Sequence, residues 1–141
     1  MRRFSHLVLP DLFLAEVIGH ARVEAPNECC GLLAGTIVDG VGIVRARFAI
    51  ANEAASPTEY LSNAEDMLAA FRTMRQQHLE LLAIYHSHPM SWPVPSQRDL
   101  ERNTYGEKVV HLIVGLGNAT PEVRAWWFRW NEAHPAAWST A

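Results

Sequence analysis

The chain has 141 residues, of which 49% are hydrophobic and 19% are charged, so the composition predicts one folded domain and excludes intrinsic disorder. The formal net charge of −3 excludes the broad basic surface that nucleic-acid binding requires. No apolar run approaches the length that spans a bilayer, and Pro10 and Glu16 interrupt the segment in which a signal peptide would be apolar. We therefore expect a cytoplasmic protein with neither nucleic acid nor membrane as a partner.

Hydrophobic periodicity predicts four elements in the first third of the chain. They are strands at residues 4–9, 30–38 and 41–50, and a helix that Pro10-Asp11 opens after the first strand. Pro26 ends the helix because proline cannot continue one. Asp39-Gly40 separates the second and third strands, which predicts an antiparallel hairpin.

The remaining residues continue this alternation of strands and helices. We expect a helix capped by Ser62 or Asn63 and running to about residue 78, strands at 79–85, 109–114 and 122–130, and a helical segment from Ser96. Residues 131–141 show no periodicity and are assigned to a C-terminal tail outside a domain that spans residues 1–130. The element order predicts an α/β fold with a mixed, partly antiparallel sheet and flanking helices.

The residues with the clearest chemistry follow the apolar run at 79–85. His86 and His88 are two positions apart, so on an extended strand both rings project from the same face. A short segment with three prolines comes next, and Asp99 then lies in the first turn of a helix. Two imidazoles, one carboxylate and an open fourth position are the composition of a catalytic zinc site.

Ser96 and Asp99 also have a purely structural interpretation. Ser-x-x-Asp is the spacing of a helix-capping box, and a carboxylate that binds zinc is poorly placed to cap. A serine hydroxyl can accept a backbone N–H and still donate its own proton. Spacing alone also leaves open which carboxylate would act beside the ligands, since the following are equally plausible: Glu24, Glu28, Glu53, Glu59 and Glu65.

Two separated motifs resemble those of one enzyme family. His-x-His-Pro, six residues and Ser-x-x-Asp form the motif of the JAMM (MPN+) zinc metalloproteases, matched here by His86, His88, Ser96 and Asp99. Residues 26–35, Pro-Asn-Glu-Cys-Cys-Gly-Leu-Leu-Ala-Gly, are similar to the segment that carries a glutamate in bacterial and archaeal members. The resemblance implies the MPN (cytidine-deaminase-like) fold.

The resemblance also implies a role for each matched residue. His86, His88 and Asp99 would bind one Zn²⁺ per chain. Glu28 would be the general base that takes a proton from water and passes it to the leaving amine. Ser96 would stabilise the oxyanion by donating its hydroxyl proton.

The substrates of this family suggest a function for the chain. JAMM relatives cleave peptide or isopeptide bonds after the C-terminal tail of ubiquitin-like proteins, and short prokaryotic members process sulfur-carrier proteins. Because the chain leaves little room for insertions that hold ubiquitin, we expect a ubiquitin-like or sulfur-carrier protein as the substrate, its tail bound as an extended strand beside a sheet edge. The alternatives are a non-catalytic MPN scaffold and a zinc amidohydrolase acting on small peptides. The sequence also allows a homodimer.

Three further residues have less specific signals. Cys29 and Cys30 are adjacent and cannot link distant segments, which fits a reducing cytoplasm. Their place in a predicted strand favours buried structural thiols over a nucleophile. Trp92 lies between the ligand motifs and is interpreted either as a wall of the substrate groove or as a packing residue.

Overall fold

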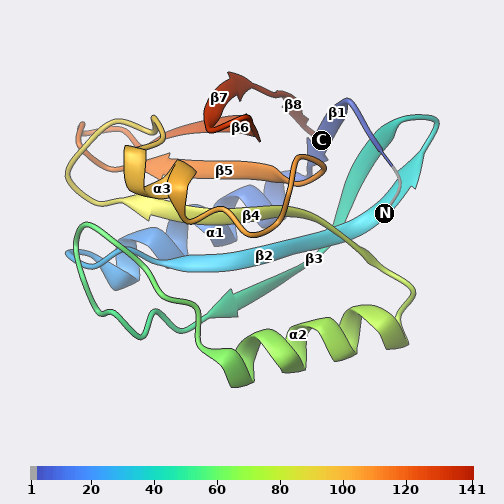
Figure 1. The fold of residues 1–141 in the computed structure, drawn as a ribbon, viewed down its shortest axis with the longest axis horizontal. Helices are drawn as coiled ribbons and strands as arrows, with labels where there is room; N and C mark the ends of the chain where they lie inside the picture. The colour runs from blue at the N-terminus through green and yellow to red at the C-terminus, as the bar shows by residue number, and fades with distance from the viewer. Residues whose placement is uncertain (1–2) are drawn as a thin grey trace.

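The computed structural model describes residues 3–141, and its strands form one eight-stranded sheet (Figure 1). In chain order the elements are β1 (His6–Leu9), α1 (Asp11–Glu24), β2 (Cys30–Val38), β3 (Val41–Ile50), α2 (Ala64–Gln76), β4 (Glu80–His88), α3 (Gln97–Glu101), β5 (Val110–Gly115), β6 (Glu122–Arg129), β7 (Glu132–Pro135) and β8 (Ala137–Thr140). The strands lie in the order β7-β6-β5-β4-β2-β3-β1-β8. Since β4 runs parallel to β5 and antiparallel to β2, the sheet is mixed, as predicted.

Local sequence signals account for the boundaries of several elements. The hairpin of β2 and β3 has its predicted bounds, and Asp39 and Gly40 both have the positive φ that its turn requires. Asn63, rather than Ser62, caps α2: its side-chain oxygen accepts a hydrogen bond of 2.8 Å from the Asp66 N–H. Strand β4 continues through His88, beyond the predicted end at residue 85.

The C-terminal residues belong to the sheet, so the prediction of an irregular tail at 131–141 is wrong. Strand β7 pairs with β6 at one edge, and β8 pairs with β1 at the other edge. Figure 1 shows these two red strands separating at the end of the chain. Each has only four residues, too few for a period of two to be recognised in the sequence. Pairing forms both strands: β7 makes a hairpin with β6, which ends two residues before it, and β8 pairs with β1 at the other end of the chain.

Helices pack on both faces of the sheet and create two apolar cores. The core under α1 contains Leu33, Leu82 and Tyr85, and the core under α2 contains Leu32, Ile84 and Met74. Figure 1 shows α1 behind the strands and α3 in front of β4. Side chains alternate along a strand, so Ile84 and Tyr85, which are consecutive on β4, face opposite cores. Within the described residues, none of the helices has the length and hydropathy needed to cross a membrane.

Candidate active site

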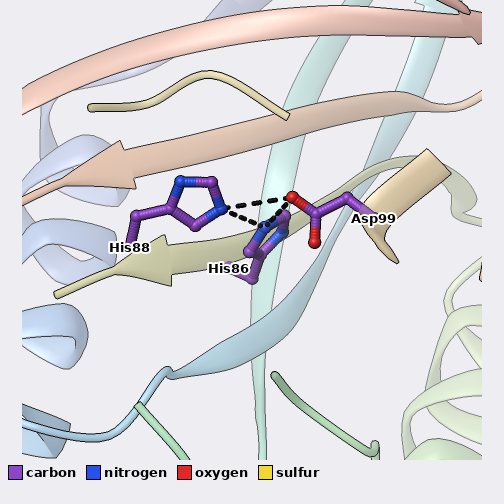
Figure 2. Close-up of side chains that lie close together, drawn as sticks. All are labelled: His86, His88 and Asp99. Carbon is purple, nitrogen blue, oxygen red and sulfur yellow. Dashed lines mark hydrogen bonds and ion pairs between the residues drawn. The ribbon is translucent and has the colours of Figure 1, made fainter. Parts of the chain in front are cut away.

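The carboxyl end of β4 and the start of α3 bring the three predicted ligands together (Figure 2). The Nε2 atoms of His86 and His88 are 3.2 Å apart. Asp99 Oδ2 lies 3.3 Å from Nε2 of His86 and 3.2 Å from Nε2 of His88. All three side chains are at most 10% exposed. The cluster could therefore hold a metal ion, with one ligand atom from each residue.

The hydrogen bonds of His88 show which of its nitrogens is free to act as a ligand. Nδ1 lies 2.8 Å from the carbonyl oxygen of Trp92, and a carbonyl can only accept, so Nδ1 carries the proton. In the neutral ring Nε2 then has a lone pair, and this lone pair faces the carboxylate of Asp99. Electron-rich atoms that converge in this way repel one another unless a proton or a metal ion lies between them. The arrangement fits a metal ion of the type that imidazole and carboxylate prefer.

In the metal-free protein, the imidazoles and the carboxylate of the cluster shift the pKa values of Asp99 and His88. Burial alone would raise the pKa of Asp99, but hydrogen bonds from the two imidazoles and the charge of His86 hold this pKa well below its usual range. Burial alone would lower the pKa of His88, whereas its bonds to Asp99 and to the Trp92 carbonyl raise it. Asp99 is therefore ionised and attracts positive charge to this position.

Ser96 and Asp99 form the capping box and shape the cluster at the same time. Ser96 Oγ accepts a hydrogen bond of 3.1 Å from the Asp99 N–H, and Asp99 Oδ2 accepts one of 2.9 Å from the Ser96 N–H. We expected capping to compete with a ligand position, but the same Oδ2 atom accepts the Ser96 amide and faces both imidazoles. The cap therefore orients the carboxylate toward the histidines.

The structure also distinguishes Glu28 from the other candidate glutamates. Strand β2 pairs Cys30 with His86, and the Ser87 N–H donates to the Cys29 carbonyl at 3.2 Å, so the register extends toward Glu28 and His88. Glu28 is 4% exposed, and its Oε1 has no hydrogen-bond partner among the described residues. Burial raises the pKa of Glu28 to about 8, although the charge of His88 opposes this shift.

The other four candidates lack this combination of burial and proximity. Glu24, Glu53 and Glu65 are exposed, and Glu59 is half-buried. The carboxylate of Glu59 is already paired with Arg98, at 3.2 Å. Glu28 is thus the carboxyl group that the tertiary structure places beside the cluster.

Comparison with known proteins identifies the family. The model of the prokaryotic homologs of the JAB domain matches residues 12–129. The chain belongs to this family. The resemblance to JAMM (MPN+) metalloproteases and the mixed α/β fold are thereby confirmed.

Individual relatives of this JAB-family chain share most of its length. A desampylase from Pyrococcus furiosus is 36% identical over 123 residues, which cover 87% of this chain and 81% of that protein. A CysO-cysteine peptidase from Mycobacterium tuberculosis is 32% identical over 108 residues, or 77% of this chain and 71% of that protein. The solution structure of protein DSY2949 from Desulfitobacterium hafniense has a TM-score of 0.87 at 24% identity and covers 96% of this chain and 92% of its own, which shows the shared fold.

A pocket of about 650 Å³ adjoins Asp99 in this JAB-family structure. Its walls include Tyr60, Arg98 and Tyr105. The ring of Tyr60 lies against His86, with the ring centres 4.9 Å apart. Sequence reasoning missed Tyr60, and no local signal could have found it, because residue 60 lies in an irregular segment.

Strand β4 is paired on both sides, so the expected addition of a substrate tail to a free sheet edge is not available at His86.

The two cysteines are buried, as predicted, with 1% exposure each. Burial raises the pKa of Cys29 to about 12 and that of Cys30 to about 11. Both thiols are therefore protonated at neutral pH, where a nucleophile would need to be a thiolate. His111, which carries no functional signal in the sequence, is also buried and stacks on Phe128 with ring centres 3.7 Å apart.

Proposed function

We propose that this protein is a zinc metalloprotease that cleaves the peptide or isopeptide bond at the C-terminal tail of a ubiquitin-like or sulfur-carrier protein. The observation that carries the proposal is the convergence of His86, His88 and Asp99 within 3.3 Å of one another beside a buried glutamate. Family membership supports the reaction class. The substrate class is supported by the desampylase and CysO-cysteine peptidase among the relatives.

The three clustered side chains would hold one zinc ion per chain. Two imidazoles and a carboxylate are a ligand set that leaves a fourth position for water or substrate. When bound, zinc lowers the pKa of a water toward about 7 and polarises a carbonyl group. The buried setting excludes bulk water from His86 and keeps the ligand atoms in place.

Glu28 is the general base in this proposal. Its Oε1 has no partner in the described chain, so it is free to bond to a water or to substrate. Burial raises its pKa to about 8, and a nearby divalent cation opposes that shift because it favours the carboxylate. Because burial raises this pKa and the cation lowers it, Glu28 can accept a proton from water and then give it to the leaving amine near neutral pH.

Ser96 is the proposed donor to the oxyanion. Its Oγ already accepts the Asp99 N–H, at 3.1 Å, so one lone pair is used and the hydroxyl proton remains available. The side chain lies at the exposed rim of the cluster, where a substrate carbonyl can approach it. A hydrogen-bond donor in this place stabilises negative charge as it develops on the carbonyl oxygen.

The decisive experiment uses a carrier protein that bears a C-terminal peptide adduct. Zinc-loaded enzyme should remove the adduct, and intact mass measures the product. Glu28→Gln should still bind about one zinc ion but slow cleavage on the order of 10³-fold, because the general base is lost. Glu65→Gln is the matched control, since Glu65 is exposed on α2, and it should leave the rate unchanged.

Other outcomes identify the alternatives. Equal cleavage of a short peptide without the carrier would favour a zinc amidohydrolase acting on small peptides. A zinc-loaded protein that binds the carrier but never cleaves it, with or without Glu28, would be a scaffold. Failure of the parent protein to bind zinc would contradict the proposal itself.

A further inference from the structure

The loop between β4 and α3 is exposed, yet it directs a backbone atom at a buried histidine. Met90, Trp92 and Val94 are 80%, 58% and 47% exposed. The carbonyl oxygen of Trp92 nevertheless lies 2.8 Å from Nδ1 of His88. An exposed segment keeps such a contact only if other residues anchor it. Pro93, between the exposed side chains, is buried and is the point of attachment.

The first anchor is the indole of Trp126 on β6. Trp126 Nε1 donates a hydrogen bond of 3.0 Å to the carbonyl oxygen of Pro93. Pro93 directly follows Trp92, so this bond restrains the chain next to the carbonyl that contacts His88. Strand β5 lies between β6 and β4 in the sheet. The Trp126 side chain thus reaches across β5 to the loop that follows β4.

The second anchor is close packing of the loop against Gly115, the last residue of β5, which has no side chain. Gly115 is the register partner of His88. A Cβ at this position would lie 2.6 Å from Cδ of Pro93 and 2.8 Å from the carbonyl oxygen of Ser91. Real Cβ atoms do not approach backbone so closely, and glycine alone leaves room for the loop. Next to Gly115, the Leu116 N–H donates a hydrogen bond of 3.0 Å to the His88 carbonyl, which holds the end of β4 against β5.

We propose that Trp126 and Gly115 are positioning residues that hold the Trp92 carbonyl on His88 and so keep Nε2 of His88 directed into the cluster. A carbonyl accepts only from Nδ1–H, which leaves Nε2 as the ligand atom. The inference rests on the proposed function, because it gives these residues a role through a zinc ligand. It adds two residues that lie outside both motifs of the family.

The test measures two properties of the full-length protein. One is the zinc dissociation constant, from competition with a chromogenic chelator. The other is the tautomer of His88 in the zinc-free protein, from imidazole nitrogen NMR at a pH at which the ring is neutral. Trp126→Phe keeps an aromatic ring but loses the N–H. It should weaken zinc binding about 10-fold, the lower end of the effect of removing a ligand's hydrogen-bond partner, and it should reduce the Nδ1–H tautomer.

A control and a second variant separate positioning from general stability. Trp138→Phe removes a half-buried indole on β8, at an edge of the sheet, and should change neither property. Gly115→Ala should weaken zinc binding in the same direction as Trp126→Phe, and it gives a result even if Trp126→Phe does not fold. Parental zinc affinity with an unchanged tautomer in the folded variants would overturn the inference. A parent protein that binds no zinc would instead overturn the proposed function, while the NMR measurement would still test the contact.

Discussion

The two faces of β4 carry polar clusters of opposite character. On the α1 side, the Tyr85 hydroxyl lies 2.7 Å from Nδ1 of His20 and accepts a hydrogen bond of 3.0 Å from Arg47. Arg47 in turn donates to Glu16 at 2.9 Å. Burial and the charge of Arg47 lower the pKa of His20, which favours the neutral ring, whose Nδ1 can accept a hydrogen bond from the Tyr85 hydroxyl. The partners of this cluster satisfy one another.

The α2 side of the same strand differs in this respect. Nε2 of His86, Nε2 of His88 and Oδ2 of Asp99 converge, and Nδ1 of His86 and Oε1 of Glu28 are buried with no partner among the described residues. A satisfied polar cluster stabilises the fold, whereas an unsatisfied one costs stability and is available to a ligand. The alternation of side chains along β4 thus separates a satisfied polar cluster from one that is available to a ligand.

The largest expected effect is the loss of a proposed metal ligand on the α2 side. His88→Ala or Asp99→Ala should abolish stoichiometric zinc binding and hydrolysis, since two donor atoms hold the ion poorly. Metal analysis after dialysis and circular dichroism measure zinc content and fold. His20→Ala, on the α1 side, should retain zinc. Full zinc occupancy in either ligand variant would show that the cluster is not the metal site.

A smaller effect is expected when Ser96, the proposed oxyanion donor, is changed. Ser96→Ala should keep the metal and lower kcat on the order of 10²-fold, as for other oxyanion donors. Steady-state kinetics on the carrier adduct measures this change. Gln97→Ala alters the adjacent exposed residue of α3 and should leave kcat unchanged, which controls for disturbance of the short helix. A parental kcat in Ser96→Ala would exclude Ser96 from the reaction.

Removing the Tyr85 hydroxyl, on the α1 side, should lower the unfolding free energy without changing zinc binding. Tyr85→Phe leaves polar atoms of His20 and Arg47 without their partner, which should cost about 1–3 kcal/mol of unfolding free energy. Chemical denaturation of the zinc-free protein measures this difference. The zinc dissociation constant should not change. A large loss of zinc affinity would mean that the two faces are coupled rather than independent.

The pH dependence of stability isolates the buried carboxyl group of Glu28. Burial raises its pKa in the folded state from 4.5 to about 8, so the folded protein binds more protons than the unfolded chain between these values. The stabilisation that comes from binding this proton in the folded state is complete below pH 4.5 and is lost as the pH rises through about 8. As the pH rises between these two values, the unfolding free energy of the zinc-free protein should therefore fall relative to that of the Glu28→Gln variant, by at most about 1.4 kcal/mol per pH unit. Parallel pH profiles for the two proteins would contradict a buried, unpartnered Glu28.

Local pattern was sufficient for much of the fold and for the ligand motif. The hairpin of β2 and β3, the cap at Asn63 and the projection of His86 and His88 from one face depend on residues that are close in sequence. The four-residue strand β8 was missed because its pairing with β1 connects the two ends of the chain. Short segments without their own periodicity become strands only when a partner strand is present.

The order of the elements from β1 to β6, the motif residues and the lack of a broad basic surface follow from the sequence alone, because these are properties of neighbouring residues and of composition. Glu28 was indicated only by the family resemblance, and its burial with an unpartnered Oε1 became visible in the tertiary structure, as did the contact of the Trp92 carbonyl with His88. The tertiary structure also brought the Trp126 indole to the Pro93 carbonyl. Burial, register and the direction of a lone pair depend on strands that are far apart in the chain, so no local pattern encodes them.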